Sequence, residues 1–320
     1  MSYHKKGMKE KTKTQETIDH YDRVARDLIR RYESDHPGAT LEESPVDVCR
    51  GIVDTRWPRL SKASKRLYRA ALVSMMSRLG HDDAARFMSG VSTDTNGDDR
   101  KDRHVRAKKL PPDYIDMIAE HLNLDRTSDR VIFSMLYAGA ISGLRPGEWR
   151  NARFVEVEGG RHILVVSNSK NTNGRAHGSE RTITFHDLDE DQSGVIDSLI
   201  TEISRLSNDE YTAMMNHIKV RLSRITAKVW PNASARPTLY SGRHQFSADA
   251  KKAGVDEVAL AAIMGHKSPD AARRFYGIRR NGGSGYGVTV TADPDDMSRV
   301  TQVEDGRDLD SVDHQINRRR

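Results

Sequence analysis

Two arginines stand where the sequence predicts that helices begin. Arg243 follows a Ser-Gly pair in the stretch LYSGRHQF (239–246), and Arg145 precedes Pro146 in GLRPGEWR (143–150). The first N–H groups of a helix lack partners and make its start electropositive, so an arginine there is disfavoured unless an anion binds beside it. Two such arginines in one domain predict two guanidinium groups on one phosphate. The alternative is that each arginine pairs with a nearby acid, such as Glu148.

Three more side chains have types that suit phosphate chemistry. His266 follows Gly265, a natural helix stop, and Tyr276 lies near the end of the next short helix. Lys170 lies at the tip of a predicted β-hairpin. Taken singly, two of them have simpler interpretations, Tyr276 as a packing residue and Lys170 as a solvent-facing lysine.

Motifs for several other chemistries are missing from the sequence. It contains no nucleotide-binding glycine loop, no H-E-x-x-H zinc motif and no G-x-S-x-G nucleophile motif. No spacing of acids predicts a two-metal site. Cys49 is the single cysteine, which excludes an internal disulfide and a cysteine-rich zinc cluster. We therefore expect no metal and no cofactor.

The charge of the chain suits a polyanionic partner without requiring one. The 320 residues carry a formal net charge of +6, and residues 291–320 hold eight acids against five arginines, so the remainder is more basic still. Many basic proteins nevertheless never bind nucleic acid. No apolar run is long enough to span a membrane and no signal peptide is visible, so we expect a cytoplasmic, nucleoid-associated protein.

Periodicity and composition divide the chain into segments that must position these residues. We predict a basic tail at 1–13, a helical domain at 14–91, a linker at 92–109, a second domain at 110–281 and a Gly-rich, acidic tail at 282–320. Because β-branched runs at 152–185 interrupt helical periodicity in the second domain, the predicted fold class is mainly α with a small β-sheet (α+β). We expect the C-terminal tail to be flexible or docked on a partner, apart from a candidate strand in GVTVTA (287–292).

Basic residues gather on one predicted helix of the first domain and in the linker. On the helix within 59–80, the cations and the apolar residues occupy different faces. Such cations are either solvated or in contact with phosphates along a duplex. The candidate DNA-binding residues are Arg59, Lys62, Lys65, Arg66, Arg69, Arg103, Arg106 and Lys108.

As an ordered series, Arg145, Lys170, Arg243, His266 and Tyr276 resemble the tyrosine recombinase (phage integrase) family. The family's first arginine lies in G-L-R-x-x-E, here residues 143–148, its second in H-x-x-R-H, here 240–244, and its histidine in G-H-x-S, here 265–268. The resemblance covers residues 110–280 and implies a catalytic domain of that type. The preceding helical region is similar in organisation to the family's core-type DNA-binding domain.

The resemblance implies DNA cleavage and rejoining without metal or ATP. Tyr276 would attack a backbone phosphorus, giving a 3′-phosphotyrosyl intermediate and a free 5′ hydroxyl, while Arg145 and Arg243 bind the nonbridging oxygens. Lys170 would protonate the leaving oxygen, and His266 and Tyr240 would donate further hydrogen bonds. Tyr240 departs from the family pattern, which has histidine there. A phenol accepts protons poorly at neutral pH, which disfavours general-base catalysis at this position.

The implied function is site-specific strand exchange on double-stranded DNA by a homo-tetramer, with the C-terminal tail as one means of assembly. A telomere resolvase and a type IB topoisomerase use similar groups and are the nearest alternatives. A DNA-binding architectural protein that has lost catalysis is an alternative of another class. The covalent adduct and its products would distinguish these functions.

Overall fold

The computed structural model describes residues 14–94, 105–157, 159–168, 176–283 and 285–301. The chain divides into two compact units, Met1–Arg103 and His104–Arg320. Within the described parts of both units, no helix is long and apolar enough to cross a membrane.

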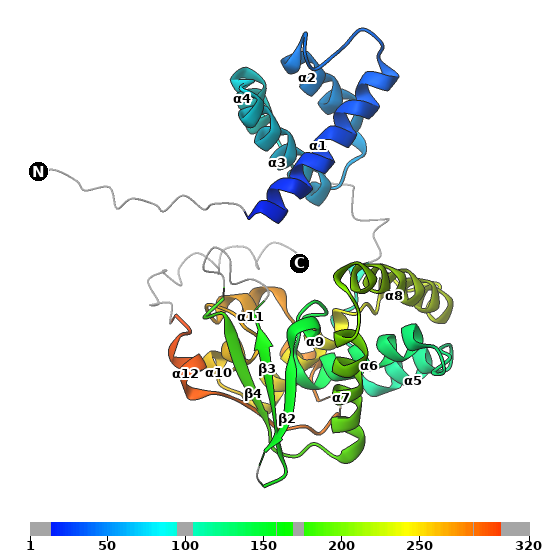
Figure 1. Cartoon of the computed structure of the whole chain (residues 1–320), viewed down its shortest axis with the longest axis vertical. Helices are drawn as coiled ribbons and strands as arrows, with labels where there is room; N and C mark the ends of the chain where they lie inside the picture. Colours follow the sequence, from blue (N-terminus) through cyan, green and yellow to red (C-terminus); the bar gives the residue numbers. More distant parts are fainter. Residues whose placement is uncertain (1–13, 95–104, 158, 169–175, 284, 302–320) are drawn as a thin grey trace, which may run out of the picture. The chain divides into compact units, whose positions relative to one another are not determined.

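The first unit is a group of helices around an apolar core that includes Leu28, Ile52 and Leu72 (Figure 1). Its elements are α1 (Gln15–Asp35), α2 (Pro45–Arg56), the 3-10 turn η1 (Trp57–Arg59), α3 (Lys62–Leu79) and α4 (Asp82–Gly90). Pro45 is the first residue of α2, a position whose N–H has no partner within the helix, so the missing N–H of proline costs no hydrogen bond. Gly80 ends α3 with a φ of 78°, which glycine adopts without strain.

The second unit is mainly α-helical with one small antiparallel sheet, as the sequence predicts. Before and within the sheet it contains β1 (Val105–Arg106), α5 (Pro112–Ala119), α6 (Thr127–Ser142), η2 (Trp149–Asn151), β2 (Arg153–Val157), β3 (Arg161–Ser167) and β4 (Glu180–Phe185). After these come α7 (Glu190–Ser204), α8 (Asn208–Val229), β5 (Ala235–Arg236), α9 (Ser241–Ala253), α10 (Glu257–Ile263), α11 (Asp270–Phe275), η4 (Arg279–Asn281), β6 (Val290–Ala292) and α12 (Pro294–Ser298).

The sheet has the strand order β2-β3-β4-β6, with every neighbouring pair antiparallel. Side chains alternate between the two faces of β4, and Arg181, Ile183 and Phe185 all lie on its buried face. Helix α10 packs against β4 and β6, and α7 packs against β2. The sheet therefore connects segments that lie far apart in the sequence.

Helices α6 and α9 cross in close contact because glycine lies at the crossing. A Cβ on Gly242 would lie only 2.7 Å from the carbonyl oxygen of Leu136, so a larger residue would push the helices apart. Gly143 ends α6 with a φ of 72°. The crossing places the turn after α6, which contains Arg145, beside the first turn of α9, which contains Arg243.

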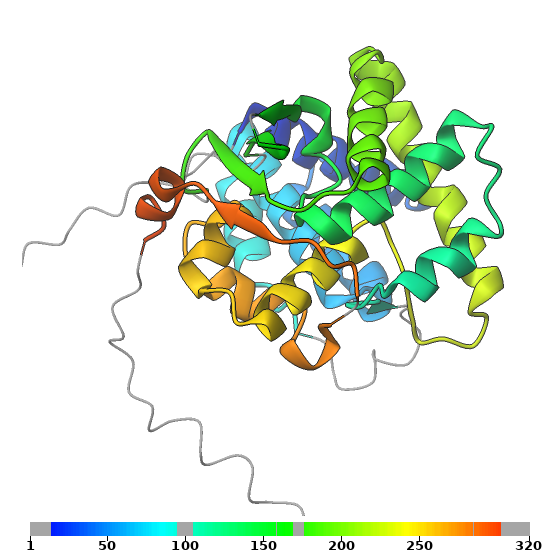
Figure 2. The ribbon, with the colours of Figure 1, turned by 90° about the horizontal axis from the view of Figure 1, so that it is seen from below.

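The C-terminal segment packs on its own chain as far as residue 301, where the sequence analysis expects a flexible or partner-docked tail. The candidate strand forms as β6 and pairs with β4; Figure 2 shows it in orange beside that green strand. Beyond it, Asp296 Oδ2 accepts a hydrogen bond from the Thr182 amide at 2.7 Å. Val300 packs on Ala261 and Ala262 of α10, and this apolar contact explains why the segment is not loose.

Candidate active site

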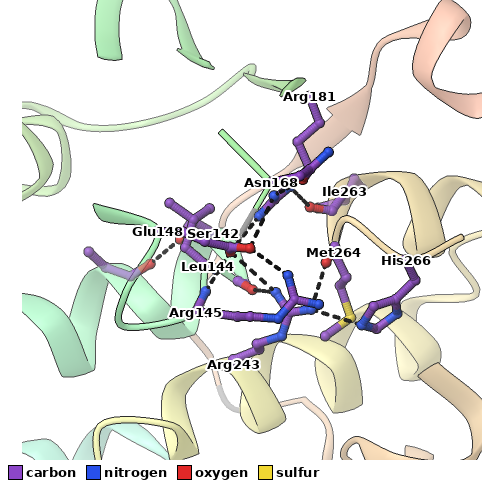
Figure 3. A network of polar contacts seen from close by, with 12 residues as sticks. Ser142, Leu144, Arg145, Glu148, Asn168, Arg181, Arg243, Ile263, Met264 and His266 are labelled. Carbon is purple, nitrogen blue, oxygen red and sulfur yellow. Dashed lines mark hydrogen bonds and ion pairs between the residues drawn. The ribbon is translucent and has the colours of Figure 1, made fainter. Parts of the chain in front are cut away.

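Arg145 lies in a tight turn after α6 and not at the start of a helix. Its amide donates to Glu148 Oε2 at 2.8 Å, and its Nη1 donates to Glu148 Oε1 at 2.5 Å (Figure 3). The predicted helix start at Pro146 is wrong, because the next helical element, η2, begins only at Trp149. Pairing with Glu148, the alternative left open by the sequence, is the arrangement observed.

Arg243 lies in the first turn of α9, as predicted, but its side chain reaches other segments of the unit. Nη1 donates to the carbonyl oxygen of Gly143 at 2.5 Å, and Nη2 donates to that of Met264 at 2.6 Å (Figure 3). Nη2 also lies 2.9 Å from His266 Nε2. Arg243 is fully buried, and it joins the turn after α6 to the turn after α10.

Glu148 is shared by three arginines. Besides its pair with Arg145, Glu148 Oε2 lies 2.8 Å from Arg181 Nη2 and 3.8 Å from Arg243 Nη1. Burial by itself would raise the pKa of the Glu148 carboxyl, but the three guanidinium groups outweigh it and hold that pKa well below its ordinary value. One carboxylate among three cations leaves an excess of buried positive charge.

Arg243 keeps its charge in this setting. Burial, followed by repulsion from Arg145, lowers the pKa of Arg243 to about 10. Because this value is well above neutral pH, the guanidinium remains protonated. Positive charge at the centre of the unit is therefore permanent under physiological conditions.

His266 is neutral and its tautomer follows from its partner. Burial and then the neighbouring arginines lower the pKa of His266 far below its ordinary value. A guanidinium only donates hydrogen bonds, so His266 Nε2 must accept from Arg243 and the ring proton lies on Nδ1. In this arrangement His266 can donate a hydrogen bond to an anion.

Tyr276 lies directly against these groups, at the end of α11. Its ring centroid is 4.8 Å from Arg243 Cζ, 4.9 Å from the His266 ring and 5.2 Å from the His244 ring. Burial alone would raise the pKa of Tyr276, but the charges of Arg243 and Arg145, together with the Tyr240 hydroxyl, outweigh it and lower that pKa. The phenol is thus disposed to ionise.

Tyr240 is the N-cap residue of α9, and its hydroxyl is one of the groups that lower the pKa of Tyr276. Burial, followed by the neighbouring Tyr276, raises the pKa of Tyr240 above its ordinary value. The Tyr240 hydroxyl therefore keeps its proton at neutral pH and is able to donate a hydrogen bond.

Lys251 of α9 fixes the segment that contains Tyr276. Its Nζ donates to the carbonyl oxygens of Ala272 and Gly277, each at 2.7 Å, and these lie on either side of Tyr276 in the sequence. Gly277 is necessary there, because a Cβ on it would lie 2.0 Å from the carbonyl oxygen of His244. Tyr276 is accordingly held beside the arginines of its own chain.

Several donors in the site have no partner within the described parts of the chain. These are Arg145 Nε, Arg243 Nε and His266 Nδ1, and all three are buried. Buried N–H groups are nearly always hydrogen-bonded, so these three donors have the capacity to bind a further acceptor, and the positive charge around them favours an anion. No group of three His, Cys, Asp or Glu side chains among the described residues is placed to hold a metal ion.

Two of the predicted residues, Lys170 and Arg103, lie outside the described residues. Arg106 lies in β1, which pairs in parallel with β5. Lys108 is exposed.

The predicted cationic face of the first unit is only partly open to solvent. Arg59 and Arg66 are exposed. The other three cations hold the segment after α4: Lys62 Nζ lies 2.5 Å from Asp94 Oδ1, Lys65 Nζ lies 3.4 Å from the Asp94 carbonyl oxygen, and Arg69 Nη1 lies 3.0 Å from that of Val91. Lys65 is buried, so the predicted separation of cations from the core does not hold at that position.

Arg181 and Lys251 belong to no motif and were not predicted as residues of the site. Arg181 had a visible signal, since it falls in register with Ile183 and Phe185 in the alternating stretch ERTITF (180–185). An arginine on the apolar face of a strand needs buried partners. Lys251 gave no such signal in the sequence, because lysines are common in the last turn of a helix.

Comparison with solved structures shows which known proteins share this fold. A crystal structure of a lambda integrase dimer bound to a COC′ core site aligns with a TM-score of 0.55 and 16% identity, over 84% of this chain and 73% of that chain. The Tn1549 transposon integrase in complex with transposon right end DNA aligns with a TM-score of 0.48 and 15% identity, over 84% of this chain and 90% of that chain. No family model and no curated protein sequence matches. On the first alignment, this chain has the fold of lambda integrase, which is the fold that the motif resemblance implies.

Proposed function

We propose that this chain is a site-specific DNA recombinase of the tyrosine recombinase family, which cleaves and rejoins strands through a 3′-phosphotyrosyl intermediate on Tyr276. The observation that carries the proposal is the set of unpartnered, buried N–H donors on Arg145, Arg243 and His266 beside a phenol of lowered pKa. The fold shared with lambda integrase supports it.

The donors suit the transition state of phosphoryl transfer. Attack on a phosphodiester concentrates negative charge on the nonbridging oxygens, and donors fixed in a buried cationic site stabilise that charge without reorganising. Arg145 and Arg243 supply the charge, and neutral His266 supplies its Nδ1–H. Losing one such contact is expected to slow cleavage by about 10²–10³-fold.

The nucleophile needs little help from a base. With its pKa lowered by Arg243 and Arg145, Tyr276 is ionised more often than a free tyrosine at the same pH. Its oxygen forms a bond to phosphorus while the bond from phosphorus to the 5′ oxygen breaks. The leaving oxygen keeps that electron pair and takes a proton, for which we propose Lys170 as the donor. Tyr240 stabilises the phenolate as a hydrogen-bond donor and does not replace the missing base.

Tyr276 and both arginines come from one chain, which supports cleavage in cis. We propose that the protein works as a homo-tetramer on double-stranded DNA. Exposed Arg59, Arg66 and Lys108 are the best-placed of the predicted phosphate contacts. The lambda integrase structure is a dimer on a core site, which supports assembly on DNA.

The test is a covalent adduct on nicked suicide substrates. The wild-type protein is expected to form a protein–DNA complex that resists denaturant, and Tyr276→Phe is expected to form none while still binding DNA. Tyr114→Phe is the control, because Tyr114 packs on Trp230 away from these residues and should leave adduct formation unchanged.

The products separate the related activities: exchanged strands indicate a recombinase, hairpins a telomere resolvase and relaxed circles a type IB topoisomerase. If wild-type protein binds DNA but forms no adduct, the proposal fails and a DNA-binding architectural protein remains.

A further inference from the structure

Arg181 is a buried cation that the mechanism above does not use. It lies on the inner face of β4 and is 1% exposed. Its Nε donates to the carbonyl oxygen of Ile263 at 2.7 Å, its Nη1 donates to Asn168 Oδ1, and its Nη2 donates to Glu148 Oε2 at 2.8 Å (Figure 3). A single guanidinium thereby binds three segments that are distant in the sequence.

Each of the three segments leads to a residue of the proposed reaction. Glu148 orients Arg145 through both the amide and the guanidinium of that arginine. Asn168 directly follows β3, two residues before Lys170 in the sequence. Ile263 ends α10 and is followed by the turn to His266.

The fit between Arg181 and the last of these segments is tight. Gly265 has a φ of 63°, and a Cβ on it would lie 2.6 Å from Asn168 Oδ1 and 2.8 Å from Arg181 Nη1. Glycine therefore gives the His266 turn both its conformation and its close approach to the guanidinium. The turn cannot move toward or away from β4 without breaking the contact between Arg181 and the Ile263 carbonyl.

Stability by itself does not explain an arginine here. Replacing a buried ion pair with apolar residues of similar volume is often neutral or stabilising, and the neighbours on this face of β4, Ile183 and Phe185, are apolar. What an apolar residue lacks is a planar fork of five N–H donors in fixed directions. The fork satisfies acceptors on three segments and so fixes their relative positions.

We propose that Arg181 is a positioning residue, which aligns the Arg145 turn, the end of β3 and the His266 turn for phosphoryl transfer. This inference rests on the proposed function. Arg181 is not one of the residues in the motif series, so the proposal adds a residue of β4 to those that support catalysis.

The experiment measures adduct formation in single turnover at saturating suicide substrate, together with DNA affinity and thermal stability. Arg181→Gln is expected to lower the rate constant by about 10–100-fold, as the loss of a residue that orients reactive groups does in metal sites. DNA affinity should stay within about threefold of wild type, because Arg181 is not exposed to DNA. Arg181→Lys should recover part of the rate, since it keeps the charge beside Glu148 but has no fork.

The matched control is Arg221→Gln. Arg221 binds buried Asp129 with two hydrogen bonds, of 2.9 and 2.8 Å, in the same unit. If Arg181 had a purely structural role, Arg181→Gln would resemble this control. Fewer molecules would be active, so the amplitude of adduct formation would fall, but the rate constant would be unchanged. That result would overturn the inference.

Asn168→Ala keeps the guanidinium and removes one of its acceptors, so it tests the same alignment if Arg181→Gln does not fold. We expect its rate constant to fall by about 3–10-fold and the double variant to be no slower than Arg181→Gln. Wild-type rate constants in both Asn168→Ala and Arg181→Lys would also overturn the inference. A wild-type protein that forms no adduct refutes the proposed function itself, whereas an adduct formed at the wild-type rate by Arg181→Gln refutes only the role of Arg181.

Discussion

His266 is a base held neutral by its surroundings, and this has a consequence for stability. Burial lowers the pKa of His266, and burial is also the largest cause of the lowered pKa of His177. When the pH falls below about 6.5, the unfolded chain protonates the His266 imidazole while the folded chain does not. The unfolded state then binds more protons, so the free energy of unfolding falls as pH falls, by about 1.4 kcal/mol per pH unit for His266. The lowered pKa of His177 acts in the same direction.

We therefore predict that His266→Gln weakens the pH dependence of stability. Between pH 6.5 and 5, its free energy of unfolding should fall less steeply than that of wild type, by about 1.4 kcal/mol per pH unit. Glu148 does not interfere, because its pKa is lowered from 4.5 and its contribution is lost only at more acidic pH. Urea denaturation at several pH values measures the slopes, with exposed His217→Gln as control. If the free energy of unfolding depends on pH equally in wild type and His266→Gln, His266 takes up its proton in the folded chain as readily as in the unfolded chain.

At this scale, the motif residues were predictable, and Glu148 was the one partner that the sequence offered. Arg145, Arg243 and His266 each stand in a motif of the series, Tyr276 follows them in order, and the structure brings all four together. The electrostatic reason given for Arg145 was wrong, since it pairs with Glu148 in a turn. Arg181 belongs to no motif, and its role depends on contacts made only after three segments meet.

The crossing of α6 and α9 determines whether Arg145 and Arg243 can share Glu148. A Cβ on Gly242 would lie 2.7 Å from the Leu136 carbonyl oxygen and 2.9 Å from the Ala140 nitrogen, both of them backbone atoms that cannot rotate away. The two helices would have to separate to accept it. Any separation would move the two arginines apart, because Arg145 follows α6 whereas Arg243 lies on α9.

We predict that Gly242→Ala is destabilising by about 1–3 kcal/mol, as overpacking of a close contact is. It should also slow adduct formation on suicide DNA. Gly194→Ala is the matched control, since Gly194 lies inside α7 with no atom within 4 Å of its Cβ position. That substitution should stabilise the helix by about 0.5–1 kcal/mol. Urea denaturation measures the free energy of unfolding of both variants. If Gly242→Ala is as stable and as active as wild type, the close crossing of α6 and α9 is not what holds Arg145 and Arg243 near Glu148.

Elements with regular periodicity were predicted well, and their ends less so. Helix α6, Thr127–Ser142, is of the first kind, because apolar residues mark its inner face and Gly143 stops it. The predicted helix starting at Pro146 does not exist, since a proline suited to a first turn is equally suited to a tight turn. Sequence patterns report local preference, whereas the turn is set by the bonds between Arg145 and Glu148.

At the scale of the whole molecule, the C-terminal segment is part of the second unit. The composition of the C-terminal segment predicts a flexible or partner-docked tail apart from the candidate strand at 287–292. That strand forms as β6, and beyond it Asp296 Oδ2 accepts a hydrogen bond from the Thr182 amide, so the segment packs on its own chain. Composition averages over the segment, whereas docking depends on a few residues at fixed spacing. The Thr301 amide donates to the carbonyl oxygen of Lys267, next to His266, so the segment also supports the site.

Two truncations separate the docked part of this segment from the residues after position 301. A chain that ends at residue 301 keeps β6, α12 and Val300 and serves as the reference. A chain that ends at residue 287 loses them, which uncovers the apolar side chains of α10 and leaves the edge of β4 unpaired. Losing one buried aliphatic side chain such as Val300, together with the pairing of β6, should cost about 3 kcal/mol, or roughly 6–12 °C for a unit of this size. Thermal denaturation followed by circular dichroism measures both midpoints. Equal midpoints for the two truncations would mean that the segment does not stabilise the fold in solution, and its contacts with β4 and α10 would then have to serve assembly instead.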